Sequence, residues 1–249
     1  MDNAYQPTIL AFLCNWCAYA GADLAGVSRL QYPPTFRVIR TMCSGRVDPL
    51  FVLKGLTEGY DGVFIGGCHP GDCHYQDGNL YTIKRVEMLQ TLLDLAGIGR
   101  DRIHLQWASA AEAQTYAESV RTFSDTIAGL GPFDPAAFNL ELAGCIRAVS
   151  SQRLRWLVGI DRQVTERANV YGVRVDPELF GRTMQEAVTA EYQKGLIQEV
   201  LCQSPASVPA LSARTRLDVY TVSQRLNELE RIGLAELAGH EGHTPIFRQ

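Results

Sequence analysis

Short apolar runs recur along the first half of the chain and predict four β-strands. Long apolar runs bounded by turn residues are typical of strands buried in a parallel sheet. Segments with helical spacing separate them, at residues 49–58, 79–96 and 110–130. Alternating strands and helices predict an α/β domain whose parallel sheet is covered on both faces, of the flavodoxin or Rossmann type. The predicted strands are 8–14 (TILAFLC), 36–39 within 35–43 (TFRVIRTMC), 61–68 (DGVFIGGC) and 101–109 (DRIHLQWAS).

The pattern becomes mainly helical after the segment GLGPFDP at 129–135, whose glycines and prolines are typical of a domain boundary. Residues 136–167 have mostly helical spacing, although Gly144 and Gly159 weaken that prediction. Asp176 and Pro177 suit the N-cap and the first position of a helix that runs to about residue 202.

The end of the chain predicts a short helix, a turn, a longer helix over 218–231 and a hairpin after Gly233. Val222, Leu226, Leu229 and Ile232 lie on one face of the longer helix. This is the outline of a winged helix. We therefore expect three parts: an α/β domain at 1–132, a helical linker or docking region at 133–203, and a winged-helix-like module at 204–249.

Composition and charge argue against a general nucleic-acid binder, a membrane-spanning protein and a secreted protein. Hydrophobic residues make up 46% of the 249 residues, which is ordinary for a globular protein with a core. The net charge of −4 gives no general affinity for nucleic acids or anionic membranes. No apolar run approaches the roughly 18 residues of a membrane span. The start of the chain lacks the basic and apolar regions of a secretory signal, so we expect a cytoplasmic protein.

The seven cysteines change this picture, because five of them fall in the first 73 residues. An odd number of cysteines in a chain without a secretory signal argues against a disulfide framework. The carboxyl ends of parallel strands meet at one edge of the sheet, and most of the five follow such ends. Soft thiolates that converge in this way suit zinc or an iron–sulfur cluster. The five candidate ligands are Cys14, Cys17, Cys43, Cys68 and Cys73.

The spacing of the cysteines favours an iron–sulfur cluster over structural zinc and over a redox-active dithiol. The C-x2-C pair Cys14–Cys17 and the C-x4-C pair Cys68–Cys73 both have spacings found in [2Fe–2S] ligand sets. Structural zinc usually stabilises small domains without a core, and this domain has one. A thioredoxin-like dithiol at Cys14 and Cys17 is also possible, but it leaves the other three cysteines unexplained. No nucleotide-binding glycine motif or catalytic triad is present, so we expect an electron carrier without a substrate of its own.

Other residues near the cysteines have supporting roles. His69 and His74 could be ligands, but five cysteines suffice, so we expect the two rings to form hydrogen bonds or to be exposed. Cys145 and Cys202 are expected to be small core hydrophobes on helices. Close backbone approach and shielding from water are expected from five further residues: Trp16, Gly66, Gly67, Pro70 and Gly71.

Four stretches between residues 8 and 131 closely resemble the delta subunit of methyl-viologen-reducing hydrogenase, a family also described as the hydrogenase iron–sulfur subunit. They are CNWCAYAGADLAG, YPPTFRVIRTMCSGRVDP, DGVFIGGCHPGDCHYQDGN and KRVEMLQTLLDLAGI. The resemblance implies a [2Fe–2S] cluster held by four of the five cysteines. Cys43, which lies outside the two close pairs, is our first choice for the spare one.

The resemblance also implies a non-catalytic role in electron transfer. The partners would be an oxidoreductase and a heterodisulfide-reductase-like flavoprotein subunit, within an electron-bifurcating or related complex of anaerobic metabolism. Hydrogenase, formate dehydrogenase and benzoyl-CoA reductase-type complexes all use proteins of this kind.

The segment 134–249 extends beyond the family pattern. A winged helix suggests DNA binding, but 13 basic and 14 acidic residues in this segment favour a docking element without nucleic acid. An iron–sulfur, redox-sensing, DNA-binding regulator is the alternative.

Overall fold

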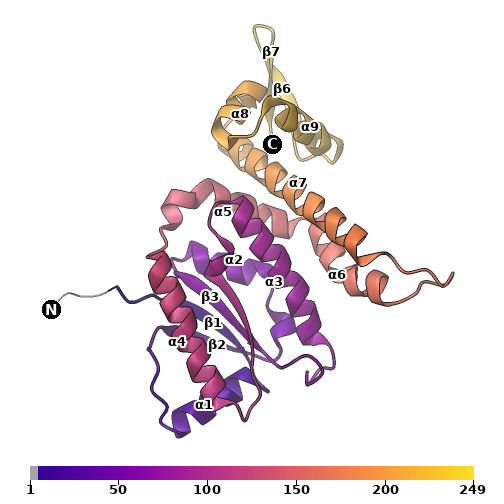
Figure 1. Cartoon of the computed structure of the whole chain (residues 1–249). Coiled ribbons are helices and arrows are strands. Elements are labelled where there is room, and N and C mark those ends of the chain that lie inside the picture. Colours follow the sequence, from indigo (N-terminus) through magenta and orange to yellow (C-terminus); the bar gives the residue numbers. More distant parts are fainter. Residues whose placement is uncertain (1–4) are drawn as a thin grey trace. The chain divides into compact units, whose positions relative to one another are not determined.

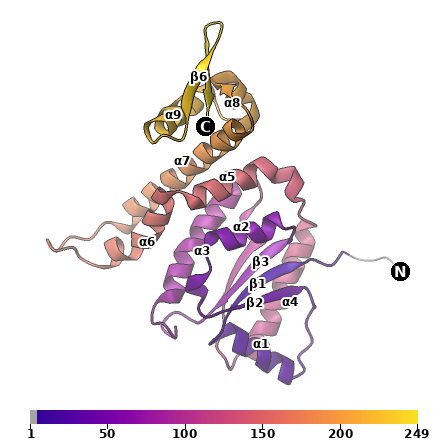
Figure 2. The same cartoon turned by 180° about the vertical axis from the view of Figure 1, so that it is seen from behind.

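The computed structural model describes residues 5–249, so the first four residues of the expected 1–132 domain lie outside the described part. The chain divides into two compact units, Met1–Ala137 and Phe138–Gln249. Figures 1 and 2 show the elements of each unit from opposite sides. No helix in residues 5–249 has the length and apolar character needed to cross a membrane.

The first unit is built on a four-stranded parallel sheet, as the sequence predicts. Its strands are β1 (Ile9–Cys14), β2 (Phe36–Thr41), β3 (Gly62–Gly67) and β4 (Ile103–Trp107). They pair in the order β2-β1-β3-β4. The central strands β1 and β3 are buried at every position, which explains their uninterrupted apolar sequences.

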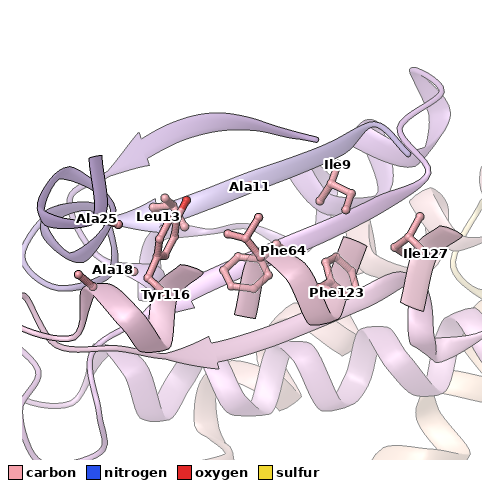
Figure 3. Packing of buried hydrophobic residues seen from close by; sticks show 11 residues of the cluster. Ile9, Ala11, Leu13, Ala18, Ala25, Phe64, Tyr116, Phe123 and Ile127 are labelled. Carbon is pink, nitrogen blue, oxygen red and sulfur yellow. The ribbon is translucent and has the colours of Figure 1, made fainter. Parts of the chain in front are cut away.

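Helices cover both faces of the central strands (Figures 1 and 2). α1 (Ala18–Val27) and α4 (Ala113–Leu130) lie on one face, and α2 (Pro49–Thr57) and α3 (Gly78–Leu95) lie on the other. In Figure 3, Ile9, Leu13 and Phe64 of the sheet pack against side chains of α4, among them Tyr116, Phe123 and Ile127. Short 3₁₀ turns complete the unit: η1 (Ser44–Arg46), η2 (Arg100–Arg102) and η3 (Pro135–Phe138).

The expected cover is incomplete at β2. This edge strand exposes most of its residues, and Val38 and Ile39 are 44% and 46% exposed. An edge strand has only one neighbour, and no helix within residues 5–249 buries β2. The prediction of a strand is therefore correct, but the prediction that both of its faces are covered is wrong.

Polar groups close the amino ends of the central strands. Asp61 precedes β3, and its Oδ2 accepts a hydrogen bond from the Thr8 N–H (2.7 Å), just ahead of β1. Asp61 Oδ1 accepts from the Phe133 N–H (2.8 Å), and Arg102 donates to the Asp61 carbonyl (2.8 Å). These hydrogen bonds hold the amino ends of the central strands together. Functional sites of parallel sheets form at the other, carboxyl, edge.

Three long helices open the second unit: α5 (Asn139–Ser150), α6 (Gln152–Glu166) and α7 (Pro177–Gln203). Ser151 has an extended backbone and separates α5 from α6, and its hydroxyl caps α6 by accepting from the Leu154 N–H. Asp176 caps α7 by accepting from the Leu179 N–H (2.8 Å), and Pro177 is the first residue of that helix. The helical predictions for this region are confirmed.

The end of the chain contains α8 (Val208–Thr215), α9 (Val219–Arg231) and a three-stranded antiparallel sheet. Its strands, in the order β5-β7-β6, are β5 (Ala206–Ser207), β7 (Thr244–Arg248) and β6 (Glu236–Glu241). Ile232, expected on the apolar face of α9, is 60% exposed, so that face ends at Leu229. The last turns of α7 share one core with α8 and α9, formed by Ile197, Val200, Leu201, Leu211, Val222, Leu226 and Leu229.

Candidate metal centre

All five candidate cysteines are buried, and they lie at the carboxyl ends of three neighbouring strands or in the segments that follow them. Cys14 is the last residue of β1, and Cys17 is the N-cap position of α1. Cys43 follows β2 and precedes η1. Cys68 comes directly after β3, and Cys73 lies between β3 and α3. Because β2, β1 and β3 are adjacent, sequence positions up to 59 residues apart meet at one edge of the sheet.

Three of the sulfurs form one group. The Sγ atoms of Cys14, Cys17 and Cys68 all lie within 4.8 Å of one another, and those of Cys14 and Cys68 are 3.7 Å apart. Cys17 and Cys68 are joined by a disulfide, with their Cα atoms 5.3 Å apart. The sequence favoured free thiolates, so this bond is a difference from expectation. The same two sulfurs can form a disulfide or bind a metal, but not both at once.

The remaining two sulfurs form a second group beside the first. Cys43 Sγ lies 4.0 Å from Cys73 Sγ and accepts a hydrogen bond from the Gly45 N–H (3.4 Å). Gly78, the first residue of α3, leaves room for this pair. A Cβ atom at position 78 would come within 2.5 Å of Cys43 Sγ and within 3.5 Å of Cys73 Sγ.

Burial and the neighbouring sulfurs raise the pKa of the Cys43 thiol. The pKa of Cys43 is raised to about 11. Burial is the largest cause, the neighbouring Cys73 and Cys14 sulfurs also raise the pKa, and the hydrogen bond from the Gly45 N–H lowers it. Closely spaced thiols resist losing their protons together, because several negative charges would then share one buried site. A bound cation removes this penalty, since metal ligands are thiolates. The donor set therefore fits a metal centre better than it fits a single reactive nucleophile.

Two helices begin at this edge of the sheet. α1 starts directly after Cys17, and α3 starts at Gly78 beside Cys43 and Cys73. The first N–H groups of a helix have no partner within the helix and carry partial positive charge. These helix starts favour anionic sulfur ligands at the edge of the sheet.

The two histidines have partners outside the sulfur group. His69 Nε2 lies 2.7 Å from Glu112 Oε2, and hydrogen bonds from His69 and the Ser109 N–H lower the pKa of Glu112. His74 stacks on Trp16, with ring centroids 3.7 Å apart. Within residues 5–249, the close group of potential metal ligands consists of cysteines alone. This arrangement agrees with the expected hydrogen-bonding and exposed positions of the two rings.

Sequence reasoning missed Asn79. This residue is fully buried, and its Nδ2 donates to the carbonyl oxygens of Cys68 (2.9 Å) and His69 (2.8 Å). It therefore fixes the loop that begins with Cys68. Its Oδ1 has no hydrogen-bond partner among the described residues. The available signal was the DGN triplet, whose residues are typical of a turn that starts a helix.

The glycines near the cysteines do not all act as expected. A Cβ at Gly66 would come within 2.7 Å of Ala18, and one at Gly67 within 2.6 Å of Trp107, so both allow close packing. Gly71 faces open space and instead adopts a positive φ of 95°. The expected close approach is therefore present at Gly66 and Gly67 but absent at Gly71.

An apolar opening on the surface lies beside Cys43. A cavity of about 600 Å³ borders Cys43. Met42, Phe51 and Tyr75 line it and are each about half exposed. Trp16, in the loop after β1, is also exposed. An exposed apolar surface of this kind is typical of a protein-binding site.

The two isolated cysteines differ from each other. Cys145 is fully buried in α5, as predicted, and burial raises the pKa of its thiol. Cys202 is exposed, so the prediction that it belongs to the core is wrong. It lies in the last turn of α7, where its neighbour Leu201 faces the core, and its sulfur contacts Arg147 (2.9 Å) and Gln249.

Comparison with known proteins agrees with the resemblance seen in the sequence. The family model of the methyl-viologen-reducing hydrogenase delta subunit matches residues 9–131. The F420-non-reducing hydrogenase vhc iron-sulfur subunit of Methanococcus voltae is 52% identical over 132 residues, which cover 53% of this chain and 92% of that protein. The F420-non-reducing hydrogenase iron-sulfur subunit of Archaeoglobus profundus is 47% identical over 133 residues, which cover 53% of this chain and 97% of that protein.

A longer relative matches over about the same length of chain. One polypeptide of the ferredoxin/F420H2-dependent CoB-CoM heterodisulfide reductase of Methanosarcina acetivorans is 46% identical over 126 residues, which cover 51% of this chain but 16% of that protein. The cysteine-rich unit therefore occurs both alone, as a small protein, and within a larger polypeptide. With its matched segment, its parallel sheet and its grouped cysteines, the chain belongs to the family of the methyl-viologen-reducing hydrogenase delta subunit.

Proposed function

We propose that this chain is a non-catalytic electron-transfer subunit that carries one [2Fe–2S] cluster. Cys14, Cys17, Cys68 and Cys73 would hold the cluster, and Cys43 would be the spare cysteine. The observation that carries this proposal is the meeting of five buried sulfurs at the carboxyl edge of one sheet. When bound, such a cluster accepts and releases one electron at a time.

Two observations favour an iron–sulfur cluster over structural zinc. The first unit has an extensive apolar core of its own and needs no metal to replace one. Relatives that match this unit along almost their whole length are named iron-sulfur subunits. A dithiol carrier would use two cysteines, whereas five are gathered here.

The chain's own residues would hold the cluster and control access to it. The starts of α1 and α3 favour negative charge on the sulfurs. Gly78 leaves space beside Cys43 and Cys73, and Asn79 fixes the loop that carries Cys68. Burial of all five sulfurs limits contact with water, which is one of the factors that set a reduction potential.

The relatives and the apolar opening support the proposed partners. Because a similar unit is part of a heterodisulfide reductase polypeptide in Methanosarcina, a flavoprotein of that type is the proposed neighbour. A hydrogenase is the proposed oxidoreductase on the other side, within an electron-bifurcating or related complex. The surface at Met42, Phe51 and Tyr75 would lie against one of these partners. We place the protein in the reducing cytoplasm, where thiolates are kept free.

Purification without oxygen, in the presence of a thiol reductant, tests the proposal. The reductant opens the Cys17–Cys68 disulfide, so the protein should contain about two iron and two acid-labile sulfide atoms per chain. The reduced protein should give an electron paramagnetic resonance signal of one [2Fe–2S] centre. Zinc without sulfide would refute the proposal.

Single substitutions separate the ligands from the spare cysteine. Cys14→Ser, Cys17→Ser, Cys68→Ser and Cys73→Ser should each lose most of the bound iron. Cys43→Ser should keep it, as should Cys145→Ser, a control in the second unit. Loss of iron in Cys43→Ser with retention in one of the other four would reassign the spare cysteine.

We propose that the winged-helix-like end of the chain is a docking element rather than a DNA reader. On α9, Arg225 pairs with Glu228 and binds Gln193 (2.8 Å), so this cation is not free for phosphate. Asp218 caps the start of the same helix. Binding of duplex DNA with a steep dependence on salt would favour the regulator instead.

A further inference from the structure

The second unit contains a cavity that the proposed electron transfer does not use. Its volume is about 660 Å³, within the range of small-molecule pockets. Side chains from the end of α5, the start of α6, the middle of α7 and the end of α9 line it. All of these elements belong to the unit Phe138–Gln249, which lies beyond the matched segment 9–131.

One wall of the cavity is cationic. Arg147, Arg153 and Lys194 line it, against one acidic side chain, Glu191. Lys194 lies 2.6 Å from Glu191, and Arg147 is paired with Glu199 (3.0 Å). The ion pair of Arg153 is long, at 3.7 Å from Glu191, and the Arg153 side chain is 49% exposed. Arg153 is therefore the least satisfied of the three cations.

Gln198 provides an independent sign of a ligand. It is only 8% exposed and lines the cavity, and its side chain takes part in no hydrogen bond among residues 5–249. The Gln198 amide is not among the fully enclosed atoms that lack a partner, so it is open to the cavity and can bind water or a ligand there. The start of α6 also lines the cavity, through Ser151, Gln152 and Arg153. The free N–H groups of a helix start favour an anion there.

Another wall of the cavity is apolar. Leu229, Ile232 and Leu234 line it, from the end of α9 and the turn that follows. Ile232 and Leu234 are 60% and 40% exposed, although the pattern of α9 would bury the first of them. A ligand with an apolar part would remove this surface from water.

We propose that this cavity binds a small organic acid, with a carboxylate at one end and a short apolar chain at the other. The carboxylate would be held by Arg153, the Gln198 amide and the start of α6. The apolar chain would lie on Leu229, Ile232 and Leu234. A bare inorganic anion would leave the apolar wall in water. This proposal is independent of the iron–sulfur cluster, because none of its residues lies in the first unit.

Titration calorimetry on the full chain, with hexanoate as the probe, tests the proposal. Hexanoate should bind in a saturable way, whereas acetate and inorganic phosphate should bind about tenfold more weakly or not at all. Arg153→Ala and Gln198→Glu should each weaken hexanoate binding by about tenfold or more. The first removes a cation, and the second places a negative charge beside the carboxylate while keeping the shape of the side chain.

Arg182→Ala is the matched control, because Arg182 is an exposed arginine of α7 that does not line the cavity. It should bind hexanoate as the unchanged protein does, and circular dichroism should show that all variants are folded. Absence of saturable binding, or equal binding by all variants, would overturn the proposal. Phosphate binding as tight as that of hexanoate would also overturn it, in favour of a plain anion site.

Discussion

Because Gly78 has no side chain, it leaves room for the sulfurs of Cys43 and Cys73. We expect Gly78→Ala to lose more than about half of the bound iron. Its Cβ would meet Cys43 Sγ at 2.5 Å, and the crowding would push against Cys73, a proposed ligand whose Sγ lies 4.0 Å from that of Cys43. Iron and sulfide analysis of the anaerobic protein checks this result. Gly129→Ala is the control, since nothing lies within 4 Å of its Cβ position in α4. Full iron content in Gly78→Ala would show that the space at residue 78 is not needed.

The sequence alone identified the cysteines but not the residues that shape their surroundings. Cysteines that follow predicted strands can be recognised in the sequence as a possible cluster, because a parallel sheet brings the carboxyl ends of its strands together. Gly78 matters only through a contact with Cys43, 35 positions earlier, and no local pattern reports such a contact. The disulfide between Cys17 and Cys68 depends in the same way on a 51-residue separation. Cys202 was misjudged because one helical position decides whether a residue faces the core or the solvent.

Among the elements, α5 and α7 pack most closely, and two glycines make this possible. A Cβ at Gly195 of α7 would lie 2.5 Å from the carbonyl oxygen of Gly144 in α5. We therefore expect Gly195→Ala to lower the free energy of unfolding of the second unit by about 1–3 kcal/mol, because the helices must separate. Denaturation followed by circular dichroism measures this change.

Gly181→Ala in the same helix is the control for that substitution. Nothing lies within 4 Å of its Cβ position, so the variant should be as stable as the unchanged protein or more stable by up to about 1 kcal/mol. Equal effects of the two substitutions would mean that helix propensity, and not the close contact with Gly144, governs position 195.

Elements with strong local signals were predicted well. Burial explains the apolar runs of β1 and β3, which are visible in the local sequence. Capping explains the start of α7, where Asp176 precedes Pro177. Gly144 was read as a weakness of its helix, whereas it is the point of closest packing with α7. The exposure of β2 also escaped prediction, because strand order decides which strand lies at the edge. Neither feature is local in sequence.

On the scale of the whole molecule, each of the two units has its own apolar core. In the first, Phe64 and Leu13 pack against α4, and in the second, α7 packs against α8 and α9. Relatives from Methanococcus voltae and Archaeoglobus profundus consist almost entirely of the matched segment, at 92% and 97% of their lengths. Proteins that resemble the first unit alone therefore occur, and the first unit of this chain has a core of its own.

We accordingly expect the segments 1–137 and 138–249 to fold when they are expressed separately. Segment 1–137 should bind as much iron per chain as the full protein, and segment 138–249 should keep its helical circular dichroism spectrum and bind no iron. A truncation at residue 120 is the control, because it removes Phe123 and Ile127 from the core that Figure 3 shows, and it should not fold. Failure of segment 1–137 to fold or to bind iron, with the full chain intact, would mean that the second unit is required to build the metal centre.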